Sequence, residues 1–159
     1  MRLRNFVPVL FAAFALFSCA SSKKTTGSVS RDKLKGTWQL DNISYEGLPE
    51  GQKVKLTILD EGTETCLKGS MWVFPNNGNG SYTINSSEPG CSPGQRNIVW
   101  SYRVDNEQPI FQYKRLPGGV KAEDVLEGYK FTIVDASGES LNLRSNVNFE
   151  GNKISINYQ

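Results

Sequence analysis

The sequence predicts an all-β protein, built as a single antiparallel up-and-down β-barrel of about eight strands. One observation is an alternation of apolar and polar residues that recurs between residues 34 and 159. This period of two is typical of antiparallel sheet with one buried and one solvated face. A second is the set of glycine- and proline-bearing turns at residues 61–62, 93–94, 117–119, 137–138 and 150–152. Closing a meander of short strands into a barrel removes its exposed edges, and a β-sandwich is the alternative.

The individual strands are predicted, in chain order, from their alternating apolar positions. These are Trp38 and Leu40; Val54, Leu56 and Ile58; Trp72 and Phe74; Tyr82 and Ile84; Ile98, Trp100, Tyr102 and Val104; Phe111 and Tyr113; Phe131 and Ile133; Leu141 and Leu143; and Ile154, Ile156 and Tyr158. Asn-Gly pairs in "PNNGNGSY", residues 75–82, predict a β-hairpin, and this stretch lacks the acidic ligands of a calcium loop. Only "VKAEDVLEG", residues 120–128, has the composition for a helical turn.

The N-terminal segment has the composition of a secretory signal. Arg2 and Arg4 precede an apolar stretch over residues 6–17, which is too short to span a membrane. Its end, Leu16-Phe17-Ser18-Cys19, resembles the bacterial lipobox, in which the signal is cut before a cysteine that becomes acylated. The alternative is an ordinary cleaved signal with an accidental cysteine. We expect residues 1–18 to be a lipoprotein signal peptide and Cys19 to anchor the protein in the lipid bilayer of the bacterial cell envelope, at the outer membrane.

A polar segment follows the predicted lipidation site. Residues 20–33 contain few apolar side chains, so we expect residues 19–33 to form a flexible, lipidated tether and residues 34–159 to form the barrel domain. The full chain has 18 Lys and Arg against 16 Asp and Glu. Because Arg2 and Arg4 leave with the signal, the mature side chains carry no net charge, which argues against a nucleic-acid partner.

Two cysteines remain once Cys19 is assigned to lipidation. Cys66 and Cys91 lie in loop-like sequence, and export places them in an oxidising compartment, so we expect a disulfide between them. Two free thiols or a metal-binding pair are the alternatives. Two sulfurs without further soft ligands do not complete a zinc site, and we expect no metal.

The chain contains no histidine. This excludes Ser-His-Asp and Cys-His nucleophile activation and the commonest general base. Carboxylate-only chemistry and a lysine-based mechanism remain possible without histidine. The candidate acidic residues are Asp60, Glu61 and Glu64, and Glu123, Asp124 and Glu127. Each group lies beside a glycine between apolar segments, so we interpret both as solvated turns. We expect no catalytic residue, no cofactor and no enzymatic activity.

The beginning of the predicted barrel resembles a known family. "LKGTWQLDNIS", residues 34–44, is similar to the Gly-x-Trp signature of lipocalins, with Gly36 and Trp38 in the matching places. The segments "CLKGSMWVF" and "RNIVWSY" are similar to those of bacterial lipocalin-like lipoproteins. The resemblance implies that Trp38 closes one barrel end beneath an arginine from the last strands, for which Arg144 is the candidate. The chain departs from the family in lacking a Thr-Asp-Tyr segment and a helix after the last strand, and in being shorter.

The aromatic residues carry the functional hypothesis. Trp72, Trp100, Tyr102 and Phe111 are candidates for the wall of a ligand-binding cup, although packing in a filled core is the alternative for each. The resulting expectation is a membrane-anchored lipoprotein that binds or carries a small hydrophobic molecule. The alternative is a non-enzymatic protein-interaction module of the envelope, an inhibitor or assembly factor, with a filled barrel and an unidentified partner.

Overall fold

The computed structural model describes residues 29–49 and 55–159. Its elements, in chain order, are η1 (Arg31–Leu34), β1 (Gly36–Gln39), β2 (Ile43–Glu46), α1 (Glu64–Leu67), β3 (Met71–Phe74), β4 (Asn79–Ile84), β5 (Gly94–Asp105), β6 (Gln108–Leu116), η2 (Ala122–Asp124), β7 (Tyr129–Ala136), β8 (Leu141–Phe149) and β9 (Asn152–Tyr158). The all-β prediction is confirmed. The helical turn predicted in residues 120–128 is η2.

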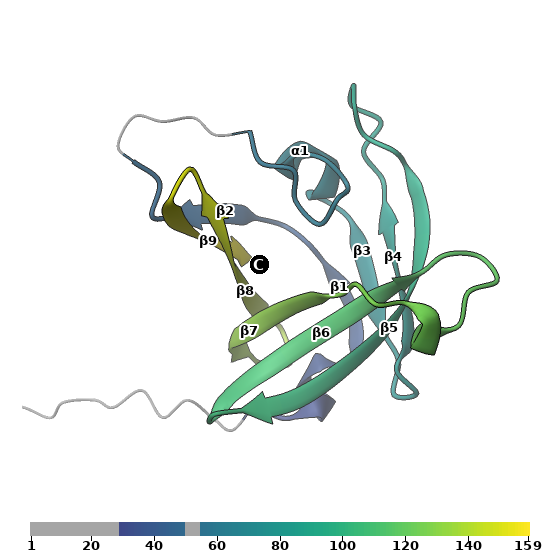
Figure 1. The fold of residues 1–159 in the computed structure, drawn as a ribbon. Helices are drawn as coiled ribbons and strands as arrows, with labels where there is room; N and C mark the ends of the chain where they lie inside the picture. Colours follow the sequence, from purple (N-terminus) through teal and green to yellow (C-terminus); the bar gives the residue numbers. More distant parts are fainter. Residues whose placement is uncertain (1–28, 50–54) are drawn as a thin grey trace, which may run out of the picture.

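All nine described strands belong to one antiparallel sheet, in the order β1-β3-β4-β5-β6-β7-β8-β9-β2. From β3 to β9 each strand pairs with the next along the chain, which is an up-and-down meander. The sheet is strongly curled, and α1 lies at the upper end of the curl in Figure 1. The hairpin predicted from the Asn-Gly pairs is β3–β4, in which Trp72 pairs with Tyr82.

The two edge strands of the sheet, β1 and β2, are consecutive in sequence and are joined by residues 40–42. The Leu40 amide donates to the Ser70 carbonyl beside β3, while the amides of Asp41 and Asn42 donate to the Gln159 carbonyl at the end of β9. This short segment therefore bridges both edges of the sheet. Counted as one bent strand, β1 and β2 give a meander of about eight strands, the number that the sequence predicts.

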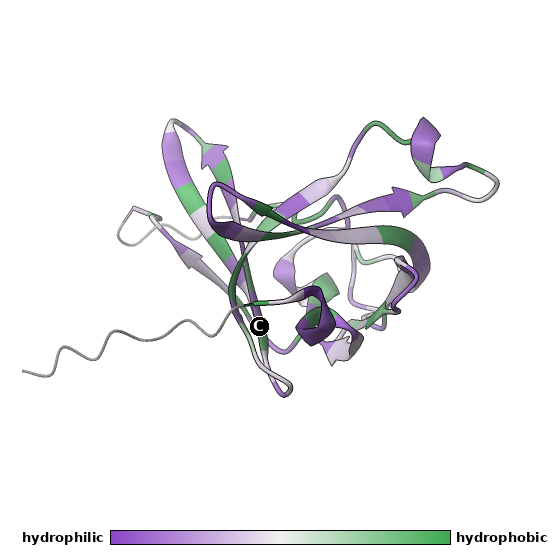
Figure 2. Ribbon diagram, turned by 90° about the horizontal axis from the view of Figure 1, so that it is seen from below, coloured by the Kyte–Doolittle hydropathy of each residue, from purple (hydrophilic) through white to green (hydrophobic). Residues whose placement is uncertain are grey.

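One face of the curled sheet forms the core. Its strands alternate hydrophobic and hydrophilic residues, visible as green and purple bands in Figure 2. Neighbouring strands present aromatic pairs to this inner face, such as Trp100 opposite Tyr113 and Phe111 opposite Phe131. Because side chains alternate between the two faces of a strand, the residues of such a pair lie together on the inner face, where they are buried.

The predicted strand over residues 54–58 is wrong in its described part. Residues 55–57 belong to no strand, and Ile58 makes only an isolated bridge with Gly62; Val54 lies outside the described residues. The additional strand is β2, which pairs with β9 and buries Ile43. Ile43 and Tyr45 do alternate with polar neighbours, but the segment is short, and only its distant partner β9 makes it a strand.

The structure describes the last residues before the predicted boundary at residue 34. Residues 29–33, assigned to the tether, contact the barrel: the Val29 carbonyl accepts a hydrogen bond from Tyr102 at 2.7 Å, and residues 31–33 begin η1. The ordered domain therefore begins no later than Val29. The predicted signal peptide, Cys19 and the tether up to residue 28 lie outside the described residues. Within the described part of the chain, no helix is long and apolar enough to cross a membrane.

Candidate functional site

A cavity of about 240 Å³ lies against the inner face of the sheet. Aromatic and aliphatic side chains form most of its wall: Trp38, Leu40, Leu59, Trp72, Phe74, Phe111, Tyr113, Phe131, Leu141, Leu143 and Tyr158. The polar members are Gln39, Asp41, Glu139, Ser140 and Gln159. Asp41 and Glu139 are exposed, so they mark the mouth, which lies between the β1–β2 connection and the turn before β8.

The four predicted ligand-lining residues divide into two pairs. Trp72 and Phe111 line the cavity. Trp100 is not part of the described wall: it is buried, donates to the Pro75 carbonyl at 3.1 Å and packs beneath the Arg31 guanidinium. Tyr102 is also absent from this wall, because its hydroxyl reaches the chain ahead of η1. The alternation of the sequence predicts that all four side chains lie on the inner face. Their positions along the barrel axis then determine which of them reach the cavity.

The expected contact between Arg144 and Trp38 does not form. Trp38 faces inward and lines the cavity, and its indole donates to the Leu34 carbonyl at 2.9 Å. Arg144 lies on the outer face of β8, where it donates to Asn157 at 2.7 Å and pairs with Glu46 at 3.1 Å. Since Leu143 lines the cavity, the strand pleat directs Arg144 to the opposite face.

Another arginine does cover a tryptophan of the inner face. The Arg31 guanidinium carbon lies 4.5 Å from the Trp100 ring centroid, within the range of a cation–π contact. Arg31 also donates to Asn76 in the β3–β4 turn at 3.0 Å. Gly36, at a φ of +137°, turns the chain from η1 into β1 with a backbone geometry that favours glycine. The segment before β1 thus closes this barrel end, with Arg31 in place of Arg144.

Stacked aromatic rings fill much of the barrel around the cavity. Trp72 stacks on Tyr82 at 4.3 Å between ring centroids, and Tyr113 stacks on Tyr129 at 4.8 Å and on Phe131 at 6.0 Å. Offset and edge-on contacts of this kind are favourable beyond the area they bury. The described interior around the cavity is therefore a packed aromatic core rather than an open cup.

Tyr113 is an exception among the described tyrosines. It is 1% exposed, and its hydroxyl has no hydrogen-bond partner among the described residues. By contrast, Tyr82 donates to Glu61, Tyr129 donates to Asp60, and the Tyr158 hydroxyl pairs with Ser145. Burial raises the pKa of Tyr113 well above its ordinary value, so the hydroxyl stays protonated and able to donate.

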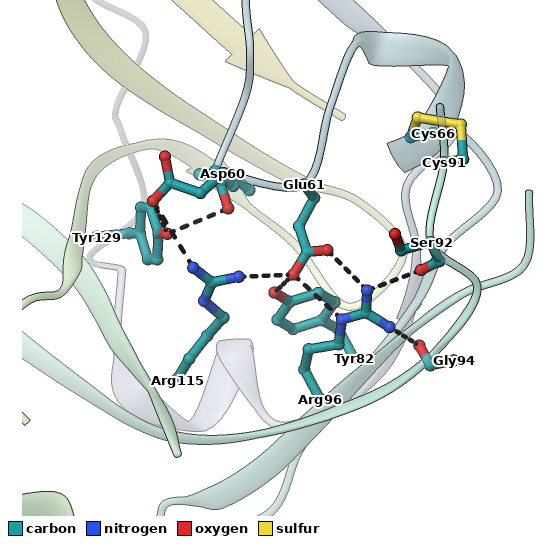
Figure 3. Close-up of polar contacts among 11 residues, drawn as sticks. Asp60, Glu61, Cys66, Tyr82, Cys91, Ser92, Gly94, Arg96, Arg115 and Tyr129 are labelled. Carbon is teal, nitrogen blue, oxygen red and sulfur yellow. Dashed lines mark hydrogen bonds and ion pairs between the residues drawn. A yellow bond between two sulfur atoms is a disulfide. The ribbon is translucent and has the colours of Figure 1, made fainter. Parts of the chain in front are cut away.

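Glu61 lies in a different environment from the one that its sequence predicts. Its side chain, assigned to a solvated turn, is only 4% exposed. It accepts hydrogen bonds from Tyr82 at 2.5 Å, from Arg96 at 2.9 and 3.2 Å, and from Arg115 at 2.9 Å (Figure 3). We call these four residues the Glu61 cluster. Both arginines lie on the inner face of the sheet, next to the aromatic core. Each forms an ion pair with the Glu61 carboxylate.

The charges of the cluster decide the protonation state of Glu61. Burial acts to raise the pKa of this carboxyl group, but the hydrogen bonds from Tyr82, Arg96 and Arg115 together with the Arg96 charge outweigh it and lower the pKa below its usual value. Burial and the bond to Glu61 raise the pKa of Tyr82, which therefore remains a donor. This arrangement is a buried ion-pair cluster in which one carboxylate accepts from two guanidinium groups and a phenol.

The predicted disulfide between Cys66 and Cys91 is present and ties α1 to the loop that precedes β5. It lies beside the Glu61 cluster (Figure 3). A Cβ at Gly62 would approach the Cys66 sulfur to 2.8 Å, and Gly62 also has a φ of +122°. Glycine is therefore required between the cluster and the disulfide. Within residues 29–49 and 55–159, no group of three or more acidic, histidine or cysteine side chains is placed to hold a metal ion.

Comparison of the chain with protein-family models, with curated proteins and with solved structures finds no significant match.

Proposed function

We propose that this protein is a lipid-anchored, lipocalin-like binding protein of the bacterial cell envelope that holds or carries a small hydrophobic molecule in its barrel. The observation that carries the proposal is the cavity of about 240 Å³ with a mainly aromatic and aliphatic wall. Apolar walls with a few polar groups are typical of small-molecule sites. The lipobox resemblance at Cys19 supports the anchor, and a chain without histidine supports a non-enzymatic role.

The size of the cavity limits the ligand. Ligand pockets for drug-sized molecules usually occupy roughly 300–1,000 Å³. An apolar cavity of about 150 Å³ binds benzene. A space of about 240 Å³ lies between these cases. The proposed ligand is therefore slightly larger than a single ring, and a full-length fatty acid is too large to be enclosed.

Native mass spectrometry of the full chain, purified from its own envelope, tests the proposal. We expect a retained small molecule in the wild type and its loss in Leu143→Trp, because Leu143 lines the cavity and a larger side chain fills it. Val104→Trp is the matched control, since Val104 is 60% exposed and lies outside the wall. Equal small-molecule content in both variants, or none in the wild type even after exposure to small apolar probes, would contradict the proposal.

A second candidate is a protein-interaction module of the envelope. Leu126 is 94% exposed in the connection between β6 and β7, and Val120 in the same connection is 39% exposed. Contiguous exposed apolar surface is typical of partner contacts, and these two residues of one connection are the candidates for such a surface. Leu126→Asp tests this candidate: loss of co-purifying protein from the native envelope, with the small molecule retained, would favour it as an additional role.

A further inference from the structure

The chain enters the barrel at a fixed place. The Val29 carbonyl accepts a hydrogen bond from the Tyr102 hydroxyl at 2.7 Å. Two residues later, Arg31 donates to Asn76 in the β3–β4 turn at 3.0 Å. In an up-and-down meander this turn lies at the same end of the barrel as the β5–β6 and β7–β8 turns. We call η1 and these three turns the tether end, and α1 lies at the opposite end (Figure 1).

The cavity mouth opens at the tether end. Glu139 and Ser140 of the β7–β8 turn line one side of the mouth, and Asp41 and Gln159 line the other. The Asp41 amide donates to the Gln159 carbonyl at 2.8 Å, beyond the last residue of β9. Because β9 runs from the β8–β9 turn toward the tether end, this side of the mouth also lies there. The disulfide, which ties α1 to the loop before β5, lies at the opposite end.

A short segment joins the tether end to the predicted anchor. Ten peptide links separate Cys19 from Val29. A flexible tether of this length has an end-to-end distance of about 16–19 Å, and it reaches about 36 Å only when fully extended. A domain the size of residues 29–159 is about 36 Å across. Turning the opposite end toward the membrane would therefore require a fully extended tether, at the cost of nearly all its conformational entropy.

The surface of the tether end suits contact with lipid headgroups. The side chains of Arg103 and Lys130 are 51% and 54% exposed, and both pair with Asp105 beside the β5–β6 turn. Val104, between two of these residues, is 60% exposed. Charged groups on long apolar stems are typical of membrane interfaces. The two mouth carboxylates are exposed, and moving them into hydrocarbon would be costly, so the rim stays in the hydrated headgroup layer.

We propose that the tether end lies against the lipid bilayer, with the cavity mouth open toward the headgroup layer. This inference rests on the lipid anchor of the proposed function and adds the orientation of the barrel to it. The partner is the bilayer surface, and the short tether sets the orientation. A small apolar molecule dissolved in the membrane then enters the cavity without crossing bulk water, while α1 and the disulfide face away from the membrane.

Fluorescent labels at three positions of the lipidated full chain measure the orientation. The disulfide and the predicted lipidation occupy the native cysteines, so an introduced cysteine provides the thiol for labelling. Val104→Cys reports on the tether end and Glu139→Cys on the mouth. Leu126→Cys is the matched control, because Leu126 is 94% exposed in the β6–β7 connection at the opposite end. Each variant is reconstituted into phosphatidylethanolamine and phosphatidylglycerol vesicles that carry an energy-transfer acceptor on the headgroups.

We expect energy transfer from the labels at Val104 and Glu139 to exceed that from the label at Leu126 by about twofold or more, because the two ends are separated by up to the width of the domain. A second variant inserts about 20 Gly and Ser residues between Thr26 and Gly27, which raises the span of a flexible tether to about 27–33 Å. The barrel can then turn over, so the difference between the labels should be lost.

Binding of cumene, a single-ring apolar probe, is measured separately for the wild type and for each variant before labelling. The fluorescence of Trp38 and Trp72 reports it, since both residues line the cavity. Cumene binding that matches the wild type shows that a variant keeps its folded barrel. If cumene does not bind to the wild type either, the ligand-binding part of the proposed function fails, whatever the labels show.

The label measurements distinguish the orientation from the anchor. Equal energy transfer from all three labels overturns the orientation, while the lipid anchor stands. Strong transfer from Val104 with weak transfer from Glu139 places the mouth away from the bilayer and also overturns the proposal. A difference that persists with the long tether overturns tether length as its cause. If no label transfers energy, the protein is not at the membrane, and the anchor in the proposed function fails.

Discussion

Replacing Glu61 by glutamine removes the negative charge at the centre of the Glu61 cluster and keeps the size of the side chain. The arginines lose their carboxylate, while the amide can still accept from Tyr82. Removing one partner of a buried ion pair costs about 3–5 kcal/mol, because the other charge is left uncompensated. The side chains of Arg96 and Arg115 are 20% and 34% exposed, so water offsets part of this cost. We expect the free energy of unfolding to fall by about 2–3 kcal/mol.

Urea denaturation of the wild type and the variant measures this change. Asp60→Asn is the matched control, since it neutralises the adjacent carboxylate, which is 69% exposed and 3.7 Å from Arg115. An exposed pair of this kind contributes less than about 1 kcal/mol. Equal midpoints for Glu61→Gln and Asp60→Asn would refute the assignment of a stabilising role to the buried cluster.

The pH dependence provides a second measurement of the same effect. Because the pKa of Glu61 is lowered in the folded protein, its contribution is present above its unfolded pKa, about 4.3, and is lost as the pH falls through the folded value. Glutamine does not titrate. The difference in the free energy of unfolding between wild type and Glu61→Gln should therefore shrink in acid below about pH 4. A difference that stays constant there would contradict the lowered pKa.

Three further predictions concern the disulfide, the barrel end and the anchor. Replacing Cys66 and Cys91 by serine should lower the free energy of unfolding by about 2–5 kcal/mol, and non-reducing peptide mapping should find the pair joined. Arg31→Ala should cost about 1–2 kcal/mol through the lost cation–π contact, whereas Arg144→Ala, on the outer face, should cost less than about 1 kcal/mol in thermal or urea unfolding. The reverse order would reinstate Arg144 as the closing residue. Cys19→Ala should release the protein from membranes or leave its signal uncut, and detergent-dependent retention of a processed variant would count against lipidation.

Alternation along the chain predicted most of the sheet, because the face of each residue follows from a local period. Ile98, Trp100 and Tyr102 show this clearly, since three spaced apolar residues determine a strand without knowledge of its partner. The disulfide was predictable for a similar reason, as the number of cysteines and the export expected from the N-terminal sequence restrict the pairing. Local patterns do not encode pairing across the barrel. Residues 43–46 become a strand only because β9 lies beside them.

The Glu61 cluster illustrates why the site was harder to predict. "LDEGTET" has the composition of a solvated turn, and the arginine partners of Glu61 lie 35 and 54 residues further along the chain. A signal was nonetheless present. Arg96 has the same parity as Ile98 and Trp100, and Arg115 the same parity as Phe111 and Tyr113, so both arginines fall on the inner face. Two inward arginines favour a carboxylate partner on the same side of the sheet, although the sequence alone does not say which one.

The turn that carries Glu61 also closes the cavity, and this leads to a last prediction. Leu59 lines the cavity and has a φ of +53°, followed by Asp60 at +54°. A left-handed backbone costs roughly 1–2 kcal/mol at a residue such as leucine but little at glycine. Leu59 is nevertheless held in place, because its carbonyl accepts from Tyr129 at 3.1 Å and the next carboxylates bind Arg115. Strain held at a cavity wall leads to the hypothesis that the Leu59 side chain matters to the site.

In Leu59→Gly the relief of backbone strain should offset most of the lost burial of a half-buried leucine, about 1–2 kcal/mol, so stability should change by less than about 1 kcal/mol. The cavity, however, loses its apolar cap, and the affinity for cumene should fall about tenfold or more. Asp60→Gly is the matched control, because it relaxes the neighbouring left-handed residue without altering the wall. Equal affinity in both variants, measured by tryptophan fluorescence, would show that the strain at Leu59 serves the turn alone and not the cavity.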